Sequence, residues 1–110
     1  MMAAEESRFL VLVPFDPREG ISLAVAARRA GKSDKTVRDW CVKHGLGRRV
    51  GGGTWVVSQV ALAMFLEGDN LALMSYLAGD RDGSAVRPYF ERFGLTPRKI
   101  DMARLQRQDE

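Results

Sequence analysis

The chain is poor in the residues from which disulfide frameworks and small metal sites are built. It holds one cysteine and one histidine among 110 residues, so no intramolecular disulfide can form and no zinc site made of cysteine and histidine can be completed. Cys41 and His44 stand at i, i+3, but no third or fourth ligand of either type exists. We therefore expect no metal and no cofactor, and we interpret Cys41 as a small core residue.

Membrane signals and catalytic groupings are missing as well. The apolar run at residues 9–13 is far too short to cross a membrane and lacks the basic leader of a signal peptide. With one histidine there is no legible Ser-His-Asp grouping, and the carboxylates are scattered. The glycines at 51–53 are not followed by the Lys-Ser/Thr of a P-loop. We expect a cytoplasmic protein without membrane contact that is not an enzyme.

What the chain does have is positive charge in one place. The net charge of +3 is modest, but residues 21–60 alone sum to +6, whereas the segments on either side are net negative. Such a concentration is typical of a surface that contacts phosphates. Basic helix faces that are merely solvated are the alternative interpretation.

The same stretch has the pattern of two short helices. Each is preceded by a serine suited to an N-cap and followed by a glycine suited to a C-cap: residues 23–30 between Ser22 and Gly31, and residues 34–44 between Ser33 and Gly45. In the second helix a mostly apolar stripe runs through Val37, Trp40, Cys41 and His44. The opposite face offers Lys35, Thr36, Arg38 and Asp39.

A hairpin and a third helix follow. Two β-prone runs at residues 46–50 and 54–57 are joined by three glycines, which supply the positive φ angles of a tight turn. Ser58 is expected to cap a third helix that ends around Gly68. We also predict a strand at residues 9–13, which would pair with the hairpin and cover its edge. Pairing with a strand of a partner molecule is the alternative.

The remaining segments are less diagnostic. Residues 1–8 are predicted to be a flexible terminus, and residues 69–110 a helical extension. The extension would hold a helix over residues 70–78, a loop at 79–83, a helix capped by Ser84, and a last helix that opens at Thr96 and Pro97. The helix after Ser84 carries a stripe of Val86, Tyr89, Phe90 and Phe93, which we interpret as core with a partial dimer interface.

The spacing of small and capping residues from Ala26 to Trp40, which reads AAxxxGxSxxTVRxW, carries a resemblance. It resembles the MerR-like winged helix-turn-helix of excisionases, or recombination directionality factors, and of related phage and plasmid DNA-binding proteins. The resemblance continues through the glycine-rich hairpin as the wing and on to Leu66, about half the chain. Lys32 and Asp39 depart from it, because family members often have an apolar residue at the first position and a basic or polar one at the second.

The resemblance implies a fold and a set of contacts. The fold would be mainly α with a small β wing: a winged helix-turn-helix over residues 9–68 plus C-terminal helices. The second helix would enter the major groove of DNA, and the DNA-contacting residues would be Ser33, Lys35, Thr36, Arg38, Lys43, Arg48 and Arg49. Arg38 is the best candidate base reader, because its guanidinium can bond guanine O6 and N7 together.

The other candidates would serve the DNA backbone. Ser33 at the helix N-terminus suits a phosphate, and Arg48 and Arg49 on the wing suit a phosphate or the minor groove. Asp39 would repel phosphate, so we expect it to accept from a cytosine N4 or to pair with Lys35 or Lys43 at i, i+4. Trp40 and Trp55 are interpreted as core residues, although stacking on bases is the alternative.

Three functions remain open at this point. The first is a sequence-specific duplex-DNA binder that assists a tyrosine or serine recombinase of a phage or mobile element, self-associates on DNA, and also regulates transcription. The second is the small subunit of a phage terminase, which marks DNA for packaging. The third is a protein-interaction module in which the helix-turn-helix is only a scaffold.

Overall fold

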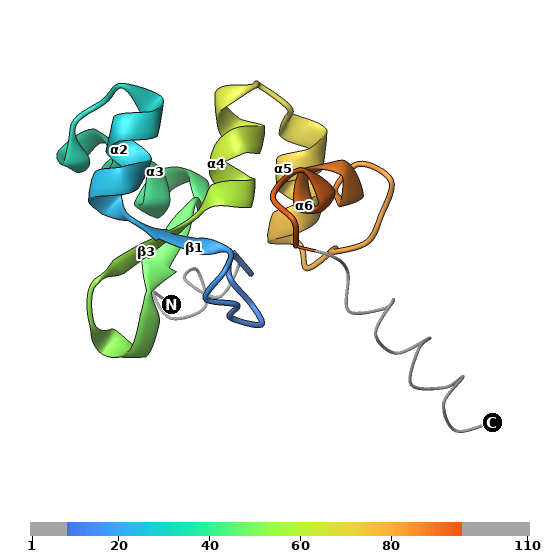
Figure 1. The fold of residues 1–110 in the computed structure, drawn as a ribbon, viewed down its shortest axis with the longest axis horizontal. Coiled ribbons are helices and arrows are strands. Elements are labelled where there is room, and N and C mark those ends of the chain that lie inside the picture. Colours follow the sequence, from blue (N-terminus) through green and yellow to red (C-terminus); the bar gives the residue numbers. More distant parts are fainter. Residues whose placement is uncertain (1–8, 96–110) are drawn as a thin grey trace.

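The computed structural model describes residues 9–95. Within that range the chain is mainly helical with a small three-stranded antiparallel sheet (Figure 1), which confirms the predicted fold class at this level. The elements are β1 (Gly20–Ser22), α2 (Leu23–Ala30), α3 (Asp34–His44), β2 (Gly47–Arg49), the 3-10 turn η1 (Val50–Gly52), β3 (Trp55–Ser58), α4 (Gln59–Leu66), α5 (Asn70–Leu77) and α6 (Arg87–Arg92). The predictions for residues 1–8 and for a helix from Thr96 lie outside the described residues.

The predicted serine caps of the first three helices are confirmed. The Oγ atoms of Ser22, Ser33 and Ser58 accept from the backbone N–H groups of the third helical residues at 3.1, 3.1 and 3.0 Å. Each bond satisfies a donor that has no partner inside its helix. Helices α2 and α3 end, as predicted, at Gly31 and Gly45, whose φ angles of 70° and 71° suit a residue without a Cβ.

The predicted hairpin is also confirmed. Strand β3 is the centre of the sheet, with β2 on one side and β1 on the other, both antiparallel to it. Gly47 faces Val57 in the register, and a Cβ there would collide with the carbonyl oxygen of Val56 and lie 2.9 Å from Cys41 Sγ. The close approach of β2 to β3 and to α3 therefore needs glycine at this position.

The predicted strand at residues 9–13 is wrong. These residues form coil and turns, and the strand that pairs with β3 is β1, at Gly20–Ser22. Val11 and Leu12 are nevertheless fully buried. Their carbonyl oxygens accept from the guanidinium of Arg48, and those of Leu10 and Val13 accept from Arg81. Because arginine side chains satisfy these backbone groups, the apolar run can be buried without a β ladder.

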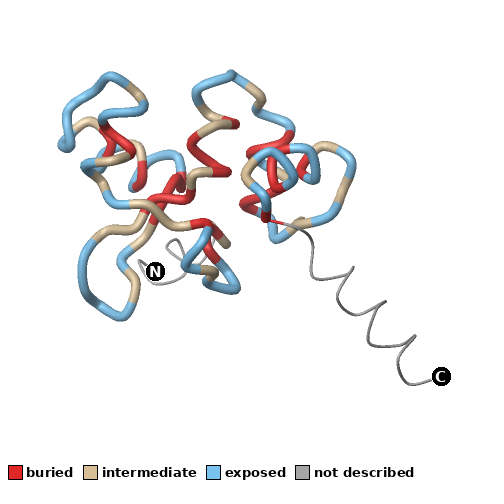
Figure 2. Tube along the Cα trace, in the orientation of Figure 1, coloured by how far each residue is buried: buried red, intermediate tan, exposed pale blue. Residues whose placement is uncertain are grey.

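The core is continuous from the sheet to the last described helix. Buried residues lie on the inner faces of α2 and α3, on β3, along α4, and on α5 and α6, while the hairpin turn is exposed (Figure 2). In Figure 1, α4 stands between the α2–α3 pair and the α5–α6 pair. Helix α4 therefore joins the basic N-terminal part to the C-terminal helices.

The apolar stripe near the C-terminus packs inward, as expected. Val86, Tyr89 and Phe90 are buried and Phe93 is half-buried. The predicted cap at Ser84 is wrong, because α6 begins at Arg87 and no side chain caps it. The backbone N–H groups of Val86 and Arg87 instead donate to the Gly83 carbonyl at 3.1 and 2.8 Å. A backbone turn thus takes the place of a serine cap.

Candidate nucleic-acid interface

The outer face of α3 carries cations that are free of the rest of the described chain. Lys35, Arg38 and Lys43 are exposed, and their side chains make no hydrogen bond or ion pair with another residue of the 9–95 range. Val37 and Cys41 are buried on the opposite face, and Trp40 is half-buried against Phe65, with ring centroids 4.9 Å apart. Because the inner face is held by packing, the outer face is presented in one fixed orientation.

Asp39 lies on the same outer face. It is exposed, and among residues 9–95 it pairs with neither Lys35 nor Lys43. The expected internal ion pair is therefore not formed within the described residues. The carboxylate remains available to a hydrogen-bond donor outside the chain.

Ser33 and Thr36 hydrogen-bond to each other at the first turn of α3. Ser33 Oγ accepts from the Thr36 N–H and donates to Thr36 Oγ1 at 3.0 Å. These two candidates therefore fix the start of the helix, and their hydroxyl groups are already bonded to each other. The orphan N–H groups of the first turn remain the polar feature at this end.

The hairpin separates the two arginines that the sequence places together. Arg48 is half-buried, and its Nε and Nη2 donate to the carbonyl oxygens of Val11 and Leu12 at 3.1 and 3.2 Å. Arg49 is exposed, and its Nε donates to the Gly53 carbonyl at 3.1 Å. Arg49 thus stands beside the glycine turn, whereas Arg48 is tied to the N-terminal segment.

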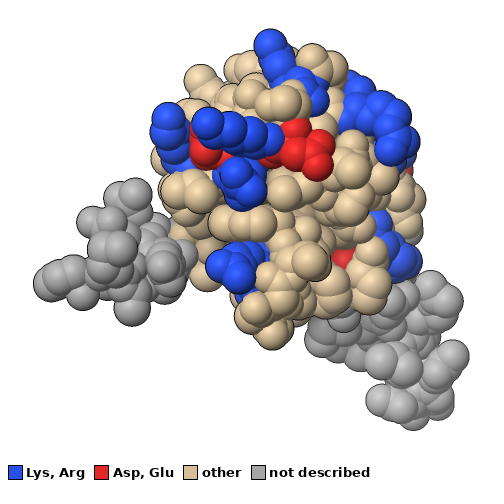
Figure 3. Space-filling model, turned by 90° about the vertical axis from the view of Figure 1, so that its left-hand side faces the viewer, with Lys and Arg blue, Asp and Glu red and all other residues tan. Residues whose placement is uncertain are grey.

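Further cations near the α2–α3 turn were not among the predicted contacts. Arg28, Arg29 and Lys32 are exposed at the end of α2 and in the turn. Figure 3 looks onto the side where Figure 1 shows this turn and the hairpin, and Lys and Arg side chains spread over it with a few carboxylates among them. In the sequence, these residues are marked only by the net charge of +6 over residues 21–60. That sum does not tell which cations would contact a phosphate and which merely lie beside the contacting ones.

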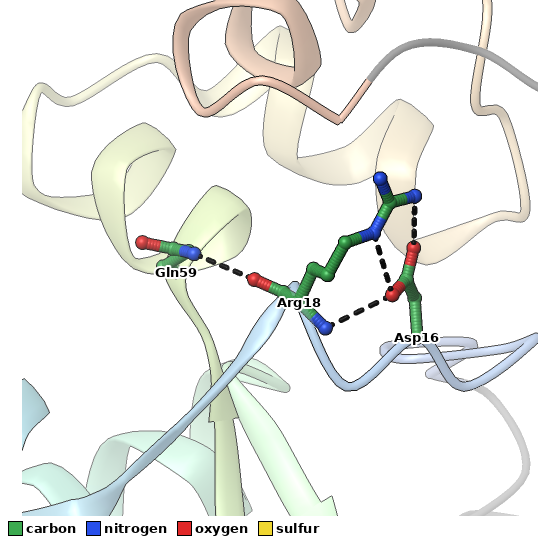
Figure 4. A network of polar contacts seen from close by, with 3 residues as sticks. All are labelled: Asp16, Arg18 and Gln59. Carbon is green, nitrogen blue, oxygen red and sulfur yellow. Dashed lines mark hydrogen bonds and ion pairs between the residues drawn. The ribbon is translucent and has the colours of Figure 1, made fainter.

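A polar network holds α2 against α4. Gln59, the first residue of α4, accepts from Arg29 Nη1 at 2.8 Å through Oε1 and donates from Nε2 to the Arg18 carbonyl at 2.9 Å. Arg18 is itself held by Asp16, through its backbone N–H and its guanidinium (Figure 4). The side chain of Gln59 therefore connects the loop before β1 to the basic end of α2.

A buried polar cluster joins the start of α4 to Tyr76 near the end of α5. The Glu19 carboxylate is 3% exposed and accepts from Ser58 Oγ at 2.5 Å and from the Tyr76 hydroxyl. The Tyr76 oxygen in turn accepts from the Leu12 N–H at 2.9 Å. Burial, and then the charge of Glu19, raises the pKa of Tyr76 well above its usual range. Ser58 is fully buried and caps α4, so the cluster stabilises the fold and offers no accessible nucleophile.

The remaining chemical candidates are packing residues. Burial raises the pKa of the Cys41 thiol to about 12, which keeps it protonated and unreactive. His44 stacks on Phe65 with ring centroids 4.9 Å apart. Across residues 9–95 no three His, Cys, Asp or Glu side chains gather in a way that could hold a metal ion.

Comparisons with known proteins found no similar protein. No protein-family model, curated protein or solved structure matches the chain. Within residues 9–95 no helix is both long enough and apolar enough to span a lipid bilayer.

Proposed function

We propose that the protein is a winged helix-turn-helix that binds duplex DNA in a sequence-specific manner. The observation that carries the proposal is the outer face of α3, where Lys35, Arg38 and Lys43 are exposed and unpaired within the described chain. Free cations on a rigid helix, beside a hairpin with a further exposed arginine, match the electrostatic footprint of a groove-binding module. The hairpin of β2 and β3 would be the wing.

The proposed docking divides the cations by task. Helix α3 enters the major groove, where Arg38 bonds a guanine through its two-pronged guanidinium. Arg49, beside the glycine turn of the hairpin, contacts a phosphate or the adjacent minor groove. Arg28 at the end of α2 and Lys32 in the α2–α3 turn add phosphate contacts, which set the register of the helix without reading sequence.

In the cell, this binder would assist a tyrosine or serine recombinase as an excisionase does. It would perform no chemistry of its own, would self-associate on neighbouring sites, and would regulate transcription where its site overlaps a promoter. The sequence resemblance to excisionases supports this role.

A packaging role is the second candidate, and one feature of α5 favours it. Leu71 and Met74 lie one helical turn apart and are 72% and 66% exposed, which suits a contact between copies of the chain. A terminase small subunit would form a stable higher oligomer without DNA. An excisionase would be a monomer or weak dimer that assembles on DNA, so the mass measured by light scattering, with and without DNA, separates the two.

Arg38→Ala tests the docking. After bound duplexes have been selected from a random pool, anisotropy titrations should show that the change weakens binding to the selected site by about 1–3 kcal/mol and relaxes preference at one base pair. Binding to random duplex should change far less.

Arg87→Ala is the matched control, because it removes the same charge from α6, where the guanidinium donates to the Asp82 carbonyl. It should leave both affinities unchanged. Equal losses on selected and random DNA for Arg38→Ala would show that Arg38 does not read a base. Failure of the wild type to bind any duplex at low salt would refute the proposal and favour a protein-interaction module.

A further inference from the structure

One apolar side chain stands on the outer face of α3. Val42 is 61% exposed, whereas the other apolar residues of this helix, Val37, Trp40 and Cys41, turn toward the core. Val42 follows Lys35, Arg38 and Asp39 at the spacing i, i+3, i+4, i+7, so the four side chains form one outward stripe.

Folding alone gives no reason for a valine at this position. A β-branched residue is a poorer helix former than alanine or lysine, because its side chain loses rotamer freedom against the preceding turn. The exposed Val42 also recovers little of the free energy that burial in a core would supply. Its side chain therefore costs helix stability without repaying it in packing.

The charges around Val42 indicate what it faces. At 100° per residue, Arg38 and Lys43 lie on either side of Val42 and Asp39 around the helix axis. Lys35 lies between Val42 and Asp39 at the centre of this stripe. The apolar group of Val42 and the carboxylate of Asp39 are both unsuited to a phosphate, so their side of the stripe suits base edges, as the guanidinium of the neighbouring Arg38 does. Lys43 on the other flank suits a phosphate of the groove.

We propose that Val42 contacts the C5 methyl group of a thymine in the major groove. The inference rests on the proposed duplex binding, and it follows because that methyl is the one apolar group on a base edge there. Arg38 and Val42 are one helical turn apart, about 6 Å along the axis at 1.5 Å per residue, or about two base steps of 3.4 Å. The thymine should therefore lie within about two base steps of the guanine read by Arg38.

Replacing thymine with uracil tests the contact, because uracil lacks only the methyl and pairs in the same way. Each thymine of the selected site is replaced singly, and affinities are measured by anisotropy. For the wild type, one replacement near the Arg38-dependent guanine should weaken binding by about fourfold, the effect of burying one methyl-sized group. For Val42→Ala, the thymine and uracil duplexes should bind equally.

Leu66→Ala is the matched control, because it shortens an exposed apolar side chain at the end of α4 and should preserve the fourfold preference. The inference is overturned, with duplex binding intact, if the wild type binds every uracil duplex as it binds the thymine duplex. It is also overturned if Val42→Ala retains the preference. If the wild type binds no duplex, the proposed function and this inference fail together.

Discussion

At the scale of single residues, four arginines of the described range, Arg38, Arg48, Arg49 and Arg81, differ in a way that the sequence does not show. Arg48 and Arg81 donate to backbone carbonyl oxygens of the N-terminal segment, and Arg81 also lies over the Tyr76 ring, 4.0 Å from its centroid. Arg38 makes no contact of this kind within the described residues, and Arg49 donates only to Gly53 of its own hairpin. The four side chains are chemically identical. Arg48 and Arg81 stabilise the fold because their carbonyl acceptors, which lie tens of residues away in the sequence, come within hydrogen-bonding distance.

Tyr76→Phe tests the buried cluster. Without the hydroxyl, the Leu12 N–H loses its acceptor and the buried Glu19 carboxylate loses one of its two donors. Because each unsatisfied buried group costs about 1–3 kcal/mol, the free energy of unfolding should fall by about 3 kcal/mol in urea denaturation. Tyr89→Phe is the control, since its hydroxyl bonds Asp69 and Glu67 at a part-buried site, and the loss there should be about 1 kcal/mol. Equal losses of unfolding free energy in the two variants would show that the buried cluster stabilises the fold no more than the part-buried site does.

Alkaline pH should destabilise the protein through Cys41 and Tyr76. Burial raises the pKa of the thiol from 9.0 to about 12 and raises that of the phenol from 10.0. Above pH 9 the folded state keeps protons that the unfolded chain releases, so the free energy of unfolding falls as pH rises. The slope should reach about 1.4 kcal/mol per pH unit for each group, and the full stability should be present below pH 9.

Urea denaturation across this alkaline range measures the effect. Cys41→Ala should abolish the part of the decline that begins near pH 9 and leave the part that begins near pH 10. There Tyr76 would titrate in the unfolded chain, together with Tyr89, whose pKa is also raised, by burial and by its carboxylate partners. A free energy of unfolding that stays constant through both values would contradict the assignment of these groups to the folded core.

At the scale of elements, local signals predicted the first three helices well, whereas the predicted serine cap of α6 is wrong. A serine cap and a glycine stop act within a few residues, so the ends of α2 and α3 could be read from the sequence alone. The misplaced strand had a different cause. Residues 9–13 have strand composition, but what decides their conformation is a set of hydrogen bonds to Arg48 and Arg81, 36 to 71 positions along the chain. No local pattern reports such partners.

The hairpin gives a prediction at this scale, because its two neighbouring arginines differ in their contacts. Arg49→Ala should weaken binding to all duplexes and reduce the slope of log affinity against log salt by about 1, since one phosphate contact is lost. Arg48→Ala should instead lower the free energy of unfolding by about 1–3 kcal/mol, because it leaves the Val11 and Leu12 carbonyls without their donor.

Salt-dependent anisotropy and urea denaturation of both variants check this division. Arg49→Ala should unfold like the wild type, because its one hydrogen bond is exposed. The division is wrong if Arg48→Ala keeps wild-type stability while losing duplex affinity as Arg49→Ala does.

At the scale of the whole molecule, α4 connects the basic part of the chain, which holds α2, α3 and the β2–β3 hairpin, to the C-terminal helices α5 and α6. The core runs through it without a break, Gln59 links it to α2, and Ser58 links it to Glu19 and to Tyr76 of α5. The sequence predicted the buried apolar stripe of α6, which holds Val86, Tyr89 and Phe90. It could not predict this side-by-side arrangement, because the polar links join residues up to 57 positions apart. Helix α3 itself is positioned by its packing on α2 and β2 and by the contact of Trp40 with Phe65 of α4.

The most direct test of duplex binding through α3 is an NMR titration of the labelled full chain with the selected duplex. We predict the largest backbone amide shifts along α3, in the α2–α3 turn and at the hairpin residues around Gly52, with the amides of α5 and α6 nearly unchanged. These shifts should reverse when salt is added, since the contacts are largely to phosphates. Shifts confined to α5 and α6, or no shifts in the presence of excess duplex, would contradict the account.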